Sequence, residues 1–303
     1  MSLKFLQKLD ARILDWELDD LIVRDCPFCK TKGDSPVFVR PDKLMVAKCA
    51  VCKAWYLPQV PSPRQIEMFY SSYDKTHRRT PPSVKADYIP MLISKLYQLN
   101  HLKEKRFLDV GFGRGHFLSE IKKHGGKIAG VELDREMISY TVKRGLLDIW
   151  QGTIFDVPLS ERFDVILLGD LIEHLINPSE LLSRAISLLN QGGLLAIITP
   201  NGATADIDDS DLVIFRVDLE HLQYLTPETI HFLAEKFQVN VIHFQEYGYP
   251  NLFEIDKKPA DMWMTRTIAT IPGFSVANKF RQWITYCFRK TGRYHLFSIL
   301  KKE

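Results

Sequence analysis

Four of the five cysteines in this chain of 303 residues lie close together, as two Cys-x-x-Cys pairs. The pairs are Cys26–Cys29 and Cys49–Cys52, and residues 30–48 separate them. Two such turns can direct four thiolates at one tetrahedral metal ion, and the spacing lies in the range of structural zinc sites. A segment this short cannot build an adequate hydrophobic core, whereas structural zinc contributes on the order of 10 kcal/mol of folding energy. The pattern predicts a small zinc ribbon, whose closed four-sulfur site is not expected to catalyse a reaction.

Disulfides or a redox pair are two other possible uses of these cysteines. Two disulfides would require an oxidising compartment, and the N-terminus lacks the apolar stretch of a signal peptide. A redox pair needs only one Cys-x-x-Cys motif. Zinc, bound by Cys26, Cys29, Cys49 and Cys52, is therefore the interpretation that the spacing favours, and we expect a cytoplasmic protein.

A second group of residues with chemical potential is a glycine-rich turn. The sequence Asp109-Val-Gly111-Phe-Gly113-Arg-Gly115 follows the apolar run Arg106–Val110 and precedes an amphipathic stretch. Glycines let a backbone turn sharply and approach a ligand closely. Close packing of a strand against a helix would also explain them, so the turn alone does not settle the matter.

An acidic residue ends the next apolar run. This run, Lys127–Glu132, places Glu132 at its carboxyl end, with Leu133 beside it. In open parallel sheets, ligands bind outside the carboxyl ends of the strands, and an acid in this position accepts hydrogen bonds from ribose hydroxyls. Together the turn and the acid predict a site for a ligand that contains adenosine.

The details of the turn favour one adenosine ligand over another. The NAD fingerprint Gly-x-Gly-x-x-Gly seats a pyrophosphate on a helix N-terminus. Here the third glycine comes one place early, and His116 stands where that fingerprint has glycine. The carboxylate of Asp109 would repel a pyrophosphate but suits a cationic ammonium. We therefore expect S-adenosylmethionine, with a nicotinamide oxidoreductase as an alternative.

The surrounding sequence alternates short apolar runs with amphipathic stretches, which is typical of a parallel sheet with helices on both faces. The expected strands are Arg106–Val110, Lys127–Glu132, Leu147–Gln151, Phe163–Leu168 and Leu194–Thr199. The expected helices between them are Gly115–His124, Arg135–Arg144 and Ser179–Asn190. Further along, we expect a capped helix over Thr226–Phe237, a strand over Val239–Phe244 and a final antiparallel strand over Tyr294–Leu300. The pattern predicts an α/β fold with a Rossmann-like, doubly wound, mostly parallel sheet.

Three regions are expected along the chain. Residues 1–60 would form an N-terminal helix and the zinc ribbon, and residues 106–303 the sheet domain. Residues 61–105 read as a helical linker or lid, with helices over Pro63–Tyr70 and Val84–Leu102 and a proline-broken loop over His77–Pro82.

Residues 106–245 resemble the class I S-adenosylmethionine-dependent methyltransferases, in particular the branch that includes the ubiquinone-biosynthesis O-methyltransferase. Beyond the turn and Glu132, the matching segments are Gly152–Pro158, Phe163–Pro178, Leu189–Leu194 and Glu220–Glu228. The resemblance implies that Gly152–Pro158 contacts the adenine and that Asp170 lines the donor site. Many relatives have Asp where this chain has Thr153, which leaves Thr153, the backbone of Ile154 and Asp156 as candidates for that contact.

The resemblance also implies where the acceptor is activated. Methyl transfer from a sulfonium is an in-line displacement, so the protein must mainly align two reactants, and a histidine base helps when the nucleophile carries a proton. His174 and His221 lie where the ligand edge of the sheet is expected, with Tyr224 and Glu220 as weaker candidates. A helix-capping role for His174 and a structural hydrogen bond for His221 are equally open.

The cysteine module followed by Pro61–Tyr70 is similar to the N-terminal zinc-binding region of sugar and natural-product methyltransferases. This implies a small-molecule acceptor: a sugar, a nucleotide-linked sugar or a secondary metabolite. The alternatives are methylation of RNA and a binding scaffold without turnover. A net charge of +3 does not favour nucleic acid, and no apolar run is long enough to span a membrane. The oligomeric state stays open.

Overall fold

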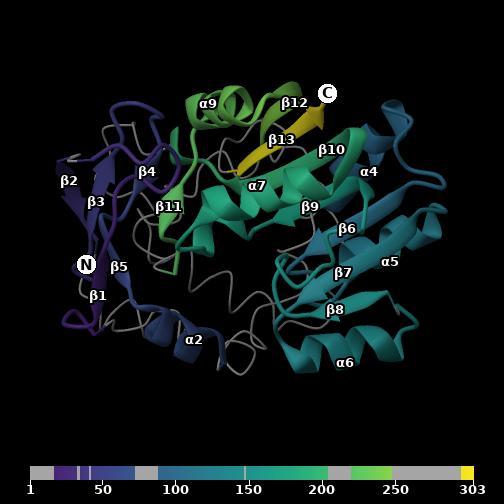
Figure 1. Cartoon of the computed structure of the whole chain (residues 1–303), viewed down its shortest axis with the longest axis horizontal. Coiled ribbons are helices and arrows are strands. Elements are labelled where there is room, and N and C mark those ends of the chain that lie inside the picture. Colours follow the sequence, from purple (N-terminus) through teal and green to yellow (C-terminus); the bar gives the residue numbers. More distant parts are fainter. Residues whose placement is uncertain are drawn as a thin grey trace, which may run out of the picture.

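A seven-stranded sheet of order β12-β13-β10-β9-β6-β7-β8 organises the larger part of the chain (Figure 1). The computed structural model describes residues 17–32, 35–40, 42–71, 88–146, 148–203, 220–247 and 295–303. The strands of this sheet are β6 (Arg106–Val110), β7 (Lys127–Glu132), β8 (Ile149–Gln151), β9 (Phe163–Gly169), β10 (Leu189–Pro200), β12 (Val239–Tyr247) and β13 (His295–Lys302). The pairs from β10 to β8 are all parallel, whereas β13 runs antiparallel to both β10 and β12. The predicted mostly parallel sheet with a final antiparallel strand is confirmed.

Helices cover both faces of this sheet, as the strand β9 illustrates. Leu167 packs with Leu92 of α4 (Tyr88–Gln98) and with α5 (His116–Lys123), and the next residue, Leu168, packs with Leu182 of α7 on the opposite face. Helices α7 (Pro178–Leu188) and α9 (Pro227–Phe237) lie on that second face. Since successive side chains of a strand point to opposite faces, a continuous apolar run is what a doubly covered strand requires.

The helix starts follow the expected chemistry. The hydroxyl of Thr226 accepts the backbone N–H of Thr229, and Pro227 occupies the first turn of α9. Helix α6 (Arg135–Lys143) begins at Asp134, whose carboxylate accepts the N–H groups of Glu136 and Met137.

The predicted boundary between the helix Ser179–Asn190 and the strand Leu194–Thr199 is wrong. Helix α7 ends at Leu188, and β10 begins at Leu189, where the sequence pattern extends the helix to Asn190. Leu189 pairs with Phe163 of β9, and the Asn190 amide donates to the carboxylate of Asp164 at 3.0 Å. These contacts with a distant part of the chain replace the last helical turn.

The cysteine-bearing segment forms two small antiparallel sheets. One pairs β1 (Leu21–Val23) with β5 (Gln59–Pro61), and α2 (Pro63–Ser71) follows. The other has the order β11-β4-β3-β2, built from β2 (Pro36–Val39), β3 (Met45–Lys48), β4 (Trp55–Tyr56) and β11 (Gln223–Tyr224). We call residues 17–62 the N-terminal module. Its larger sheet takes its last strand from a segment far along the chain, as β4 and β11 show in Figure 1.

Some predictions lie outside the described residues: the N-terminal helix, as far as it falls in residues 1–16, and the loop His77–Pro82. The division of the chain at residues 60 and 105 stays a prediction. Among the residues that the structure describes, no helix combines the length and hydropathy that crossing a bilayer would take.

Candidate active site and candidate metal site

In the turn after β6, all three glycines have a positive φ, a conformation that favours glycine. Gly111, Gly113 and Gly115 have φ of 71°, 52° and 65°. A Cβ on Gly115 would meet Thr141 at 3.0 Å, so this glycine also permits close packing. A Cβ on Gly113 would meet nothing within 4 Å, which leaves this part of the turn open on the side where a ligand would approach.

Glu132 is fixed directly beside this turn. One carboxylate oxygen accepts the N–H of Gly113 at 2.8 Å, and the other accepts the N–H groups of Leu133 at 2.7 Å and Asp134 at 3.1 Å. The acid that ends β7 is therefore held by the glycine turn on one side and by the start of α6 on the other. The structure brings the two predicted halves of the donor site together.

Asp109 lies at the base of the turn with 5% of its surface exposed. Burial, together with the nearby negative charge of Glu132, raises the pKa of Asp109 to about 8. Such a carboxyl group holds its proton at neutral pH until a cation comes near. Its position suits the binding of a cationic ammonium.

The turn after β8 borders Glu132, because the N–H of Gly152 donates to the backbone oxygen of Glu132 at 2.8 Å. The carboxylate of Asp156 accepts the N–H of Thr153 at 2.7 Å and its hydroxyl at 3.0 Å, and these bonds lower the pKa of Asp156. Ile154 is buried in the core. Asp156 thus stabilises the turn, and the residue that contacts adenine stays a prediction.

Two exposed apolar side chains flank this edge. Leu133, a predicted site residue, is 64% exposed, and Phe155 is 56% exposed. Both follow carboxyl ends of neighbouring strands, β7 and β8. Phe155 lies in the predicted adenine-contacting segment Gly152–Pro158 but was not singled out, although an aromatic residue in a turn at the ligand edge is a recognisable signal.

The end of β9 closes the other side of the glycine turn. The N–H of Asp170 donates to Ile198 at 2.9 Å, and a Cβ on Gly111 would lie 3.4 Å from Leu171. Tyr88 of α4 packs here too: its hydroxyl would meet a Cβ on Gly169 at 2.7 Å. Burial, with the nearby charges of Asp170 and Asp109, raises the pKa of Tyr88 well above its ordinary value. Tyr88 was not predicted as a site residue, because it lies in residues 61–105, which the sequence pattern indicates as a linker.

The predicted catalytic residues lie around the short helix that follows β9. His174 ends the short 3₁₀ helix η1 (Ile172–His174), and its ring centroid lies 4.6 Å from that of His221. The ring of Tyr224 lies 5.9 Å from His221, and that of Tyr70 lies 6.1 Å from His174. Glu220, next to His221 in the chain, is buried. The structure therefore places His174, His221 and Tyr224 in one cluster.

Hydrogen bonds explain why the two histidines meet. The N–H of Leu222 donates to the backbone oxygen of Glu173 at 2.8 Å. The buried amide of Gln223 donates to the backbone oxygens of Ile172 at 2.5 Å and Leu175 at 2.8 Å. The segment that carries His221 is thus fastened to the turn that carries His174. Gln223 was not predicted as a site residue.

The four cysteines of the N-terminal module form the candidate metal site. Their sulfurs all lie within 4.8 Å of one another, with 3.5 Å between Cys26 and Cys52 and 3.3 Å between Cys29 and Cys49. Each pair sits on a turn of the same form, in which the residue after the second cysteine has a φ near 60° and donates to the carbonyl of the first cysteine. Zn–S bonds of about 2.3 Å in a tetrahedron place sulfurs about 3.8 Å apart, so the arrangement fits one zinc ion.

The protonation of the cluster also fits a cation. A hydrogen bond from Cys52 is the largest of the effects that lower the pKa of Cys26 to about 5, whereas burial raises the pKa of Cys49 to about 12. One thiolate therefore forms easily, and its neighbours resist further negative charge. A divalent cation would offset that charge.

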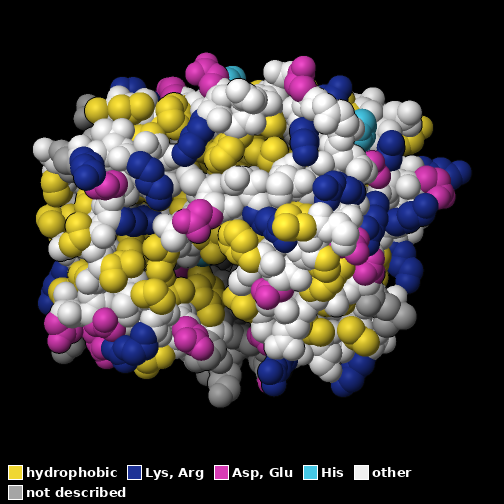
Figure 2. Space-filling view, in the orientation of Figure 1, with side chains coloured by type: hydrophobic (Ala, Val, Ile, Leu, Met, Phe, Trp, Pro, Cys, Tyr) yellow, Lys and Arg dark blue, Asp and Glu magenta, His cyan; other side chains and the backbone are white. Residues whose placement is uncertain are grey.

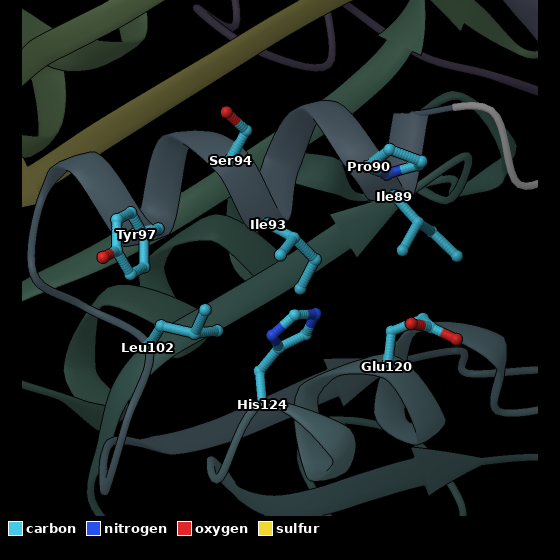
Figure 3. Close-up of a pocket in the computed structure, with 8 residues that line it drawn as sticks. All are labelled: Ile89, Pro90, Ile93, Ser94, Tyr97, Leu102, Glu120 and His124. Atoms are coloured by element: carbon cyan, nitrogen blue, oxygen red, sulfur yellow. The ribbon is translucent and has the colours of Figure 1, made fainter.

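A separate hollow of about 480 Å³ lies between α4 and α5 (Figure 3). Ile93 and Tyr97 of α4 face Glu120 and His124 across it. None of the predicted site residues lines this hollow, so it is distinct from the candidate donor site.

Apolar side chains also gather on the surface where the N-terminal module meets the sheet domain, as Figure 2 shows.

The chain is similar to known methyltransferases in sequence. Over 108 residues it is 32% identical to the ubiquinone biosynthesis O-methyltransferase of Nitrobacter winogradskyi, which covers 34% of this chain and 41% of that protein. Over 118 residues it is 28% identical to the Coxiella burnetii protein of the same name, covering 37% of this chain and 50% of that one. The chain thus matches half or less of the length of these relatives.

Two solved structures share the fold. A 1,6-didemethyltoxoflavin-N1-methyltransferase of Burkholderia thailandensis aligns with a TM-score of 0.52 at 14% identity, over 88% of this chain and 99% of that one. A protein described as a putative sarcosine dimethylglycine methyltransferase, of Galdieria sulphuraria, aligns with a TM-score of 0.50 at 18% identity, over 71% of this chain and 85% of that one.

The sequence profile of the methyltransferase domain family matches residues 85–244, which is more than half of the chain. This range includes the glycine turn, Glu132 and both histidines of the cluster. The chain therefore belongs to the methyltransferase domain family.

Proposed function

We propose that this protein transfers a methyl group from S-adenosylmethionine to a small-molecule acceptor. The observation that carries the proposal is the position of Glu132, whose carboxylate is fixed by the N–H of Gly113 beside the buried Asp109. This arrangement offers an acceptor for ribose hydroxyls next to a carboxyl group that can pair with an ammonium group. Family membership supports the same donor.

Each part of the crevice would hold one part of the donor. Glu132 binds the ribose, the open turn at Gly113 lets the ligand approach the backbone, and Asp109 attracts the ammonium of the methionine part. Leu133 and Phe155 provide apolar surface for the adenine, next to the turn of Thr153, Ile154 and Asp156. Asp170 follows the end of β9, next to Leu171, which lies against the glycine turn at Gly111.

Bound S-adenosylmethionine supplies an activated methyl group on a sulfonium, so the protein needs to align the acceptor and to remove its proton. His221 is placed to take that proton as the acceptor's nucleophilic atom bonds to the methyl carbon. His174 lies next to it and can share or orient the proton. Tyr224 and Glu220 complete the polar side of the acceptor site, and both are buried.

The acceptor would be small, such as a sugar, a nucleotide-linked sugar or a secondary metabolite. The cluster around His221 is buried, and the formal net charge is only +3. An RNA acceptor would require a more strongly basic surface next to the site. The N-terminal module would hold a structural zinc ion through its four cysteines, without taking part in the chemistry.

Calorimetric titration of the purified protein tests the proposed donor. We expect S-adenosylhomocysteine to bind with a stoichiometry of one per chain and NAD⁺ to give no heat of binding. Binding of NAD⁺ with no response to S-adenosylhomocysteine would instead indicate an oxidoreductase. Donor binding without methylation in a screen of phenols, sugars and nucleotide-linked sugars would favour a scaffold or a nucleic-acid substrate, and the same assay with RNA distinguishes these two.

Replacing Glu132 with alanine should weaken S-adenosylhomocysteine binding on the order of 100-fold. The reason is the loss of hydrogen bonds from two hydroxyls to a charged acceptor, each with a net contribution of about 1.5–3 kcal/mol. Calorimetry measures the change. Glu136→Ala, which removes an exposed acid from the first turn of α6, is the matched control and should leave the affinity unchanged. Equal affinities for Glu132→Ala and the wild type would rule out this assignment.

Donor affinity should depend on pH through Asp109. Because the pKa of Asp109 is raised to about 8 in the free protein, the group is protonated at pH 6–7, and an ammonium bound beside it would drive the proton off. Binding of S-adenosylhomocysteine should therefore release a proton and strengthen as the pH rises from 6 to 8. Titrations in buffers of different ionisation enthalpy count the protons. Asp109→Asn should remove the proton release, and a wild-type affinity that is flat between pH 6 and 8 would contradict this role.

A further inference from the structure

A buried arginine of the N-terminal module reaches the segment that carries His221 and Tyr224. Arg40 follows β2, and its side chain is fully buried together with that of Asp42. The two form an ion pair, with 2.5 Å between Nη2 and Oδ2 and 3.2 Å between Nε and Oδ1. The remaining terminal nitrogen, Nη1, donates to the backbone oxygen of His221 at 2.6 Å and to the hydroxyl of Tyr224 at 3.1 Å.

The geometry of a guanidinium makes this contact specific. Its donors project from one rigid plane, so the edge that meets Asp42 fixes the direction of Nη1. The backbone of His221 and the hydroxyl of Tyr224 are therefore held at a set spacing from the module. Because the Tyr224 oxygen accepts from a cation, its own proton points away from Arg40.

Stability alone does not account for this buried ion pair. Desolvating two charges costs several kcal/mol each, and well-packed apolar residues of similar size often stabilise a fold as well or better. A buried pair is better explained where its orientation is used. In this protein the orientation has a use. The Nη1 group of Arg40, which does not bind Asp42, donates to the two candidate acceptor-site residues His221 and Tyr224.

A second arginine of the module holds the next peptide unit. Arg24 donates to the backbone oxygen of Leu222 at 2.6 Å, and also to Ile176 at 2.9 Å and Leu57 at 2.9 Å. The N–H of Leu57 donates to the same oxygen of Leu222 at 3.0 Å. Two consecutive carbonyls, those of residues 221 and 222, are thus each bound by an arginine of the N-terminal module.

We propose that Arg40 is a positioning residue of the acceptor site, which sets the placement of His221 and the direction of the Tyr224 hydroxyl. The N-terminal module then acts in catalysis through Arg40, without contacting the donor. This inference rests on the proposed function, because it matters for turnover only if His221 and Tyr224 face the acceptor.

The test removes the pair while keeping the core filled. In the double variant Arg40→Met/Asp42→Leu, apolar side chains replace both charges, so we expect the zinc content, the thermal transition and the affinity for S-adenosylhomocysteine to stay close to those of the wild type. The matched control is Arg64→Met/Asp20→Leu, which removes the exposed ion pair of 2.7 Å between α2 and the N-terminal module.

Two readouts report on position. In protein labelled with ¹³C-histidine, the ring signal of His221 (identified by its loss in His221→Gln) should shift or broaden in the Arg40 double variant but not in the control. With an acceptor found by the screen, kcat should fall about 10- to 100-fold in the double variant while the KM for S-adenosylmethionine stays the same. An unchanged His221 signal with unchanged kcat would overturn the inference.

The outcomes separate this inference from the proposed function. If His221→Gln retains full turnover, the assignment of His221 as the base fails, whatever the Arg40 variants do. If His221→Gln is impaired and the folded double variant is not, only the positioning role fails. Should the double variant lose its zinc or its fold, Arg40→Lys takes its place: the single ammonium can remain beside Asp42 but cannot also bridge His221 and Tyr224, and the same NMR criterion applies.

Discussion

Replacing Cys49 with serine should abolish zinc binding and loosen the N-terminal module together with the segment around His221. Structural zinc contributes on the order of 10 kcal/mol of folding energy in small modules, and a serine hydroxyl does not substitute for a thiolate ligand. The module is bound to the sheet domain by contacts close to its metal site. The hydroxyl of Thr229 donates to the backbone oxygen of Cys52 at 2.9 Å, and that of Ser179 donates to Pro27 at 2.9 Å.

The consequences should reach the acceptor site but not the donor site. β11 pairs with β4, which begins three residues after Cys52, so loss of zinc should release residues 223–224 and with them His221. The contacts of Glu132 come from the glycine turn and α6, so donor affinity should change less than threefold. Metal analysis should find one zinc per wild-type chain and none in Cys49→Ser, and a new unfolding transition should appear at lower temperature. Cys287→Ser, outside both cysteine pairs, is the control; full zinc content in Cys49→Ser would refute the four-cysteine site.

Replacing His221 with glutamine should lower kcat by 10²- to 10⁴-fold, which is the range of general-base catalysis. Glutamine keeps a polar side chain of similar size but does not take up a proton at neutral pH. Since Glu132 is held by the glycine turn and the start of α6, the affinity for S-adenosylhomocysteine should remain that of the wild type. The expected pattern is a loss in turnover without a loss in donor binding.

Initial rates of S-adenosylhomocysteine formation, with an acceptor from the screen, measure this effect. His231→Gln is the matched control, because His231 is an exposed histidine on α9. We expect its rates to equal those of the wild type. A His221→Gln protein with wild-type kcat would show that proximity to His174 reflects packing alone, and the search for a base would move to His174.

The donor crevice is the part of the molecule that the sequence predicted best. β6 and β7 begin and end where expected, because each is a short apolar run that stops at a turn or a charge. Glu132 and the glycines are local to these strands, so their meeting at one edge follows from parallel pairing. These residues are close in sequence, and parallel sheets in general bring the carboxyl ends of neighbouring strands to one edge.

The acceptor site was predicted only in outline. His174, His221 and Tyr224 were named, but the residues that fix them were not. Arg40 lies 181 positions from His221 along the chain, and Gln223 acts through its side-chain amide on two backbone oxygens. No periodicity or spacing signals such contacts, since they depend on how segments far apart in the chain pack together. The end of α7 at Leu188 was misjudged because the contacts of Leu189 with Phe163 and of Asn190 with Asp164 also join distant parts of the chain.

A crystal structure of the protein with S-adenosylhomocysteine tests the central claim most directly. The account predicts the ligand in the crevice over the glycine turn, with both ribose hydroxyls within hydrogen-bond distance of the Glu132 carboxylate and the amino group near Asp109. An empty crevice at saturating ligand, or a pyrophosphate-containing dinucleotide bound there in its place, would contradict it.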